Sequence, residues 1–166
     1  SRLRWLNSTL GIDDESVDPY PPILPNPEGY FQVLCRDILP GAFGLPARIR
    51  TDELDILAAP IQLRVLTPNG PQEFPDGSLL PTARRSGRVT WNRQTASDDF
   101  EWRSRVSLEF DGFITCEVTL KARHDLDAAE VLLEMPMHPD AARYMMGFGQ
   151  PGCETPEKFE ARWGGP

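Results

Sequence analysis

The residues with the clearest potential for chemistry lie on neighbouring predicted strands, where charged side chains occupy every second position. Glu101, Arg103, Arg105 and Glu109 share one face of a strand, and Glu117 lies on the same face of the next strand. Hydrolysis of a glycosidic bond usually needs two acids roughly 5 to 10 Å apart. Glu101 and Glu109 are separated by roughly 26 Å at a rise of ~3.3 Å per residue, so these two cannot act together. Glu117 can lie nearer to either of them.

No catalytic residue and no metal-ligand set is predicted. The sequence contains neither CxxC nor HExxH, and its two histidines, His124 and His138, have no surrounding ligand pattern. It also has no GxSxG turn for a nucleophile and no glycine-rich phosphate loop. The cysteines are odd in number and widely spaced, which is not a disulfide framework: Cys35, Cys116 and Cys153. We therefore predict no cofactor.

Composition restricts the partners. The chain has 166 residues and a net charge of −8, with a computed pI of about 4.8. An acidic surface repels phosphate backbones and anionic lipids, so neither nucleic acid nor a membrane is an expected partner. No apolar run is long enough to span a bilayer. No signal peptide is recognisable and the chain opens at Ser1, so we assign no cellular compartment.

The pattern of apolar residues predicts an all-β fold, an antiparallel β-sandwich with long amphipathic hairpins and little helix. The 17 prolines and 13 glycines suit a chain with many turns. Apolar and polar residues alternate clearly in three runs, and turn residues such as Gly112 separate the segments. The predicted strands are 30–36 with a possible continuation to 39, 45–50, 61–65, 87–93, 100–111, 114–120 and 129–135. Residues 137–146 can form one helical turn or a short helix.

The alternation also predicts a core. In the hairpin of residues 100–120, one face is apolar and only Ser104 interrupts it. One face of an antiparallel hairpin commonly packs on the core while the other meets solvent. We therefore expect these residues to be buried together: Trp102, Val106, Leu108, Phe110, Ile114, Cys116, Val118 and Leu120.

The chain is expected to hold one folded domain and a tail. Residues 1–146 form the predicted β-sandwich domain. Residues 147–166 are rich in glycine and proline and are predicted to be a linker or the start of a following domain.

Several short motifs, in their order, resemble a family. They are RLRWLNSTLGIDD at 2–14, FEWR at 100–103, EFDG at 109–112, LLEMP at 132–136 and AARYMMG at 141–147. The chain resembles a domain of unknown function in large bacterial glycoside-hydrolase-like proteins, which are similar to glycoside hydrolase family 123, the β-N-acetylgalactosaminidases. In such proteins, the resemblance implies, an N-terminal β-sandwich region precedes a (β/α)8-type catalytic barrel.

The resemblance does not bring catalytic residues with it. The family's adjacent Asp-Glu pair works with the acetamido group of the substrate and belongs to the barrel. Asp14-Glu15 and Asp52-Glu53 are adjacent pairs, but both lie in turn-like sequence. The resemblance therefore implies a non-catalytic accessory domain that supports a catalytic domain of the same chain in carbohydrate metabolism. An autonomous carbohydrate-binding module is the alternative, and a small stand-alone hydrolase is a more distant one.

A sugar-binding role would fall to the polar face of the hairpin. Forked, charged donors suit vicinal hydroxyls, and an indole ring offers a face on which a sugar can stack. The candidate carbohydrate-binding residues are Trp91, Arg103, Arg105 and Glu117. The competing interpretation is a solvated ladder of cross-strand charges, or a face buried against another domain.

Overall fold

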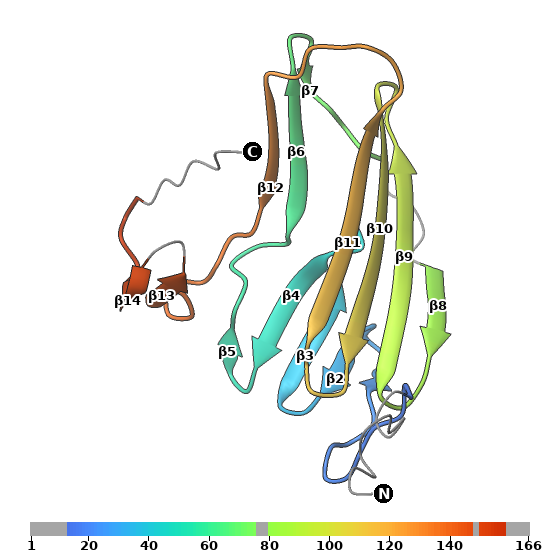
Figure 1. The fold of residues 1–166 in the computed structure, drawn as a ribbon, viewed down its shortest axis with the longest axis vertical. Helices are drawn as coiled ribbons and strands as arrows, with labels where there is room; N and C mark the ends of the chain where they lie inside the picture. The colour runs from blue at the N-terminus through green and yellow to red at the C-terminus, as the bar shows by residue number, and fades with distance from the viewer. Residues whose placement is uncertain (1–12, 76–79, 148–149, 159–166) are drawn as a thin grey trace, which may run out of the picture.

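The computed structural model describes residues 13–75, 80–147 and 150–158, and all regular structure in these ranges is β-strand (Figure 1). The predicted all-β fold is confirmed, and no helix of the described residues is long and apolar enough to cross a membrane. The strands are β1 (Leu24–Pro25), β2 (Phe31–Val33), β3 (Arg36–Pro40), β4 (Pro46–Thr51), β5 (Leu54–Asp55), β6 (Gln62–Thr67), β7 (Gly70–Pro71), β8 (Leu80–Arg84), β9 (Arg88–Ala96), β10 (Phe100–Glu109), β11 (Ile114–Ala122), β12 (Glu130–Glu134), β13 (Tyr144–Gly147) and β14 (Gln150–Glu154).

The strands form two packed layers and a separate small hairpin. One layer is the four-stranded sheet β11-β10-β9-β8. The other layer combines the five-stranded sheet β1-β2-β3-β4-β5 with the three-stranded sheet β12-β6-β7. A backbone hydrogen bond of 3.0 Å from the amide of Ile61 to the carbonyl of Pro46 joins these two sheets. Buried side chains from both layers make one core, to which the second layer contributes Val33, Ile38 and Val65. This arrangement is a β-sandwich.

The long hairpin has the predicted register. β10 pairs antiparallel with β9 on one side and β11 on the other. Its residues alternate between buried and more exposed along the whole strand, so Trp102, Val106 and Leu108 point into the core while Arg103 and Arg105 point outward. The period-two pattern in the sequence therefore assigned the faces of β10 correctly.

Indole groups join the two layers. Trp91 Nε1 donates to the carbonyl of Gly44 at 2.6 Å, and Trp102 Nε1 donates to the carbonyl of Phe43 at 3.0 Å. Ser104, the polar interruption of the apolar face, donates its hydroxyl to the same Phe43 carbonyl at 2.7 Å. Gly44 has a φ of +76°, and a Cβ there would lie 2.4 Å from Ser104 Oγ. Only glycine therefore fits at this close approach of residues 43 and 44 to the opposite sheet, which we call the crossing.

The strand predicted over residues 30–36 was wrong in its bounds. The chain reverses after Val33, and β2 and β3 form a tight hairpin in which Val33 is opposite Arg36. Leu34 takes a φ of +50° to make the turn, a conformation that a non-glycine residue seldom adopts. Positions 34 and 35 hold no typical turn residue, so the sequence pattern predicted one continuous strand there. The next predicted strand, 45–50, does return beside β3 as β4.

The predicted core was wrong at two positions. Phe110, Ile114 and Leu120 are partly buried against the core, but Cys116 is exposed and Val118 is 43 % exposed. Both lie directly opposite buried residues of β10, so they are on the inner face as predicted. They are exposed because β11 is the last strand of its sheet and the second layer does not cover it there.

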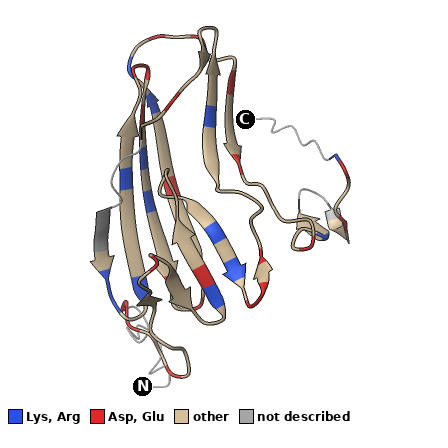
Figure 2. Ribbon diagram, turned by 180° about the vertical axis from the view of Figure 1, so that it is seen from behind, with Lys and Arg blue, Asp and Glu red and all other residues tan. Residues whose placement is uncertain are grey.

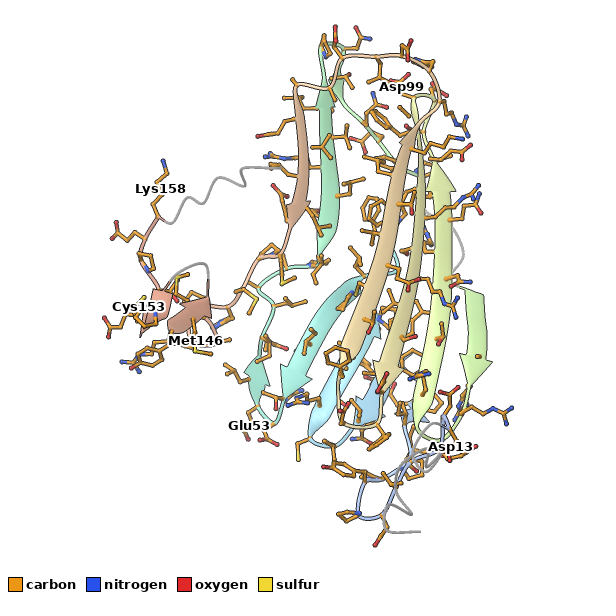
Figure 3. All side chains as sticks on the ribbon, in the orientation of Figure 1. Asp13, Glu53, Asp99, Met146, Cys153 and Lys158 are labelled. Atoms are coloured by element: carbon orange, nitrogen blue, oxygen red, sulfur yellow. The ribbon has the colours of Figure 1, made fainter. Side chains whose placement is uncertain are left out.

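Of the two alternatives that the sequence allows, one helical turn or a short helix, residues 137–146 contain a single turn, followed by a strand. The amides of Ala141 and Ala142 both bond to the carbonyl of His138 at 3.0 Å, and the chain then enters β13. β13 pairs with β14 across the boundary that was predicted between residues 146 and 147. Figure 3 labels Met146 and Cys153 on this hairpin, beside the larger sheets. The division into residues 1–146 and 147–166 stays a prediction.

The buried face of β10 generates a stability prediction. Leu108→Ala should lower the free energy of unfolding by about 2–5 kcal/mol, because it removes a fully buried side chain and leaves a cavity. Val118→Ala on the uncovered inner face should change it by less than about 1 kcal/mol. Urea denaturation of both variants measures this, and a loss under about 0.5 kcal/mol for Leu108→Ala would contradict the assigned register.

Candidate functional site

The outer face of the four-stranded sheet carries a shallow depression of about 370 Å³. Three neighbouring strands, β9, β10 and β11, form its floor. Its lining residues are Asn92, Gln94, Arg103, Arg105, Glu117 and Thr119, together with Arg93 and Ser104, which are themselves buried. Three of the four residues predicted to bind carbohydrate, Arg103, Arg105 and Glu117, are therefore brought together here.

The register sets how these side chains are arranged. Arg105 on the central strand lies between Asn92 of β9 and Glu117 of β11. Arg103, one step along the same face, lies between Gln94 and Thr119. Directly opposite side chains on an antiparallel pair are close neighbours. The depression thus presents two guanidinium groups flanked by amides, a hydroxyl and one carboxylate.

The charges of this face are only partly paired. Arg103 Nη2 lies 3.6 Å from the Glu101 carboxylate, which also receives Arg123 at 3.7 Å. Arg88, farther along, is paired with Asp14 and Glu109 at 2.5 and 2.8 Å. Within the described parts of the chain, Arg105 and Glu117 make no ion pair, although they are directly opposite each other. The predicted ladder of cross-strand ion pairs is therefore incomplete at the depression.

Trp91 does not belong to this surface. Its side chain is fully buried, stacks on Phe31 with ring centroids 5.3 Å apart, and bonds to Gly44. It points to the inner face, because it lies opposite buried Val106. A buried ring that holds the two layers together cannot be a stacking platform for a sugar, so we remove Trp91 from the candidate set. The depression itself is lined by no aromatic residue.

One acceptor in the wall lacks a donor. Asn92 Oδ1 is buried and has no hydrogen-bond partner among the described residues. Buried polar atoms in proteins are nearly always hydrogen-bonded. This oxygen lies beneath the surface, so a ligand in the depression does not reach it as the side chains stand.

One adjacent acid pair is engaged in structural contacts, and the other lies in a turn. Asp14 is ion-paired with Arg88, and Glu15 accepts a hydrogen bond from the Ser86 hydroxyl. Asp52 occupies the turn between β4 and β5 with a φ of +50°. Among residues 13–75, 80–147 and 150–158, no three His, Cys, Asp or Glu side chains are grouped so that they could hold a metal ion.

A second surface, which the sequence did not reveal, lies where the sandwich is open. β11 is the edge of the four-stranded sheet and β12 the edge of the three-stranded one, and both lie on the same side of the molecule (Figure 1). Val131 and Leu133 of β12 are 50 and 52 % exposed, although they lie opposite buried Val65 and Leu63. We call these two residues, with Cys116 and Val118, the open edge.

Charge is kept away from the β12 part of the open edge. Glu130 and Glu134 alternate with Val131 and Leu133 and point to the other face of the sheet. There Arg64 bonds to both carboxylates, at 3.4 and 3.3 Å. The inner face of β12 is consequently apolar and uncharged, as the cores of protein interfaces usually are.

Comparison with known proteins found one family. The family model described as "Glycoside hydrolase 123, third domain" matches residues 28–165. No curated protein and no solved structure matches the chain.

The open edge generates a prediction for its cysteine. Desolvation by its neighbours raises the pKa of the Cys116 thiol, and only the thiolate reacts readily with alkylating agents. The rate of Cys116 labelling by iodoacetamide should therefore reach its midpoint at a pH above the ordinary thiol pKa of about 8.5. Mass spectrometry of labelled peptides across pH measures this. A midpoint at or below that value would contradict the prediction.

Proposed function

Because the chain belongs to the third-domain family of glycoside hydrolase 123, we propose that it is a non-catalytic accessory domain that supports the catalytic barrel of a larger hydrolase. The family that the sequence motifs predicted is confirmed. The matched family is named as a third domain, whereas the resemblance put the region before the barrel. The order of this domain and the barrel along the parent chain is therefore left open in our proposal.

The observation that carries the proposal is the open edge. A complete sandwich would cover the inner faces of β11 and β12, yet Val118, Val131 and Leu133 are between 43 and 52 % exposed. Both strands also end their sheets, and edge strands can pair with added segments. In a family of multidomain hydrolases, an apolar face and two free edges suit a neighbouring domain of the same chain.

The supporting role does not require chemistry in this chain. Asp14 and Glu15 make structural contacts with Arg88 and Ser86, Asp52 and Glu53 lie in a turn, and Glu101 and Glu109 are held by arginines. The proposed contribution is to stabilise and position the barrel, whose own residues act on the substrate.

A second candidate function is carbohydrate binding at the depression. It is favoured by the unpaired Arg105 and Glu117 on the outer face. The depression lies on the outer face of the four-stranded sheet and the open edge on inner faces, so the two functions are compatible. An open sheet face buries less of a ligand than a cleft does, so binding of a sugar there is expected to be weak.

The non-catalytic role predicts that the purified chain does not hydrolyse an aryl N-acetylgalactosaminide. Release of the chromophore should stay at the spontaneous rate, because acids that lie close together, such as Asp14 and Glu109, are both tied to Arg88 by ion pairs and so are not free to flank a scissile bond. The full-length parent protein, assayed in parallel, shows whether the substrate is suitable. Hydrolysis by the chain alone would contradict the accessory role.

The supporting role also predicts that Cys116 is covered in the parent protein. We expect iodoacetamide to label Cys116 at least about tenfold more slowly in the parent than in the isolated chain, because the docked domain excludes the reagent. The exposed Cys35, in the turn between β2 and β3, should react at the same rate in both. Leu133→Asn should restore labelling of Cys116 in the parent.

A matched variant controls for this substitution. Leu66 is 39 % exposed on the other face of the same sheet, opposite Glu130. Leu66→Asn should leave Cys116 protected. Equal labelling of Cys116 in the parent and in the isolated chain would show that nothing docks on the open edge.

A further inference from the structure

We propose that the depression on β9, β10 and β11 binds an anionic saccharide, whose carboxylate or sulfate group is held by Arg103 and Arg105. This proposal rests on the second candidate function, carbohydrate binding, and adds the charge class of the ligand. It is independent of docking at the open edge.

The two arginines have the spacing and exposure that an anionic group requires. Arg103 and Arg105 are two residues apart on β10, so both point outward on one face at a spacing of about 7 Å. Both side chains are exposed. Arg105 has no ion pair in the described ranges, and Arg103 has only the 3.6 Å contact with Glu101. A guanidinium binds a planar carboxylate or a sulfate through two parallel hydrogen bonds, which gives geometry as well as charge.

The outer face around the depression carries an excess of positive charge. The chain carries a net charge of −8, but Figure 2 marks Lys and Arg residues on β9, β10 and β11, and all of these except the buried Arg93 lie on the outer face. Arg88 and Arg123 are held by carboxylates, at 2.8 and 3.7 Å. Among the described residues of this face, two cations, Arg105 and Lys121, make no ion pair. One acid of the same face, Glu117, also makes none. An acidic protein thus keeps a local excess of positive charge at one depression, where it attracts an anion.

Neutral polar groups beside the arginines favour a sugar over a simple anion. Asn92, Gln94 and Thr119 line the depression beside the arginines. Their amide and hydroxyl groups can donate to and accept from ring hydroxyls. A sulfate ion offers no donor, whereas a saccharide ring offers several. The depression therefore matches a sugar that carries an anionic group.

Glu117 makes the proposal easy to test. It lies directly opposite Arg105, so its carboxylate repels an anionic ligand. Glu117→Gln removes that charge and keeps the shape and the hydrogen-bonding capacity of the side chain. The substitution should strengthen binding of an anionic sugar. It should weaken or leave unchanged the binding of a neutral sugar that donates hydroxyls to the carboxylate.

The experiment is isothermal titration of the chain at low salt with three probes. They are an oligosaccharide containing uronic acid, a sulfated N-acetylgalactosamine oligosaccharide and neutral N-acetylgalactosamine. At least one anionic probe should bind at least about tenfold more tightly than the neutral sugar, and added salt should weaken the interaction. Comparison of the first two probes identifies the carboxylate or the sulfate as the preferred group.

The variants assign the effect to named residues. Arg105→Gln should weaken anionic binding by about tenfold or more, and Glu117→Gln should strengthen it severalfold. Arg85→Gln, which removes the same charge from an exposed loop side chain, should have little effect. If Arg105→Gln is misfolded by circular dichroism, Arg105→Lys keeps the charge but loses the fork and should also bind more weakly.

The outcomes that overturn the proposal are distinct from those that overturn the accessory role. Absence of anionic binding, equal binding of the neutral sugar, or weaker binding by Glu117→Gln would each refute the anionic ligand. The accessory role is judged separately, from the protection of Cys116 in the parent protein. The experiments can therefore refute the anionic ligand without refuting the accessory role, and the reverse.

Discussion

The packing of the sandwich depends on the carbonyl groups of Phe43 and Gly44, which receive three hydrogen bonds from the opposite layer. Two indole N–H groups and the Ser104 hydroxyl supply them, at 2.6 to 3.0 Å. Each donor would be costly to bury without a partner. The segment can come close enough only because residue 44 is glycine, since a Cβ would collide with Ser104. This crossing holds the loop before β4 against the centre of the four-stranded sheet.

The crossing also determines where ligand chemistry can occur. It uses the inner face of β9 and β10 completely, and it places Trp91 and Trp102 in the core at 0 and 1 % exposure. Because side chains alternate along a strand, the other face of the same strands is left with Arg103, Arg105 and their polar neighbours. Packing and any recognition of a ligand are thereby separated onto opposite faces of one sheet. A site there depends on charge and hydrogen bonds, because its aromatic residues are committed to packing.

The open edge arises from the order of the strands. β11 and β12 follow each other in the chain, but β11 pairs with β10 and β12 pairs with β6 in the other layer. Each strand thus ends its own sheet on the same side of the molecule (Figure 1). Nothing in the described residues covers Val131 and Leu133, although their neighbours on β6 are buried. Val131 and Leu133 therefore alternate with polar residues as core residues do, but they are exposed like surface residues.

The sequence alone determined the local features of this protein. Alternation of residue types identified β10, β11 and their inner and outer faces, because a period of two is a property of a single strand. It therefore also brought Arg103, Arg105 and Glu117 onto one face, and its motifs identified the family. Tertiary structure decided which of those faces are covered. Trp91, Cys116 and Val118 are all on the inner face, yet Trp91 is buried and the other two are exposed. Coverage depends on which distant strands lie across the layer, and that information is non-local in sequence.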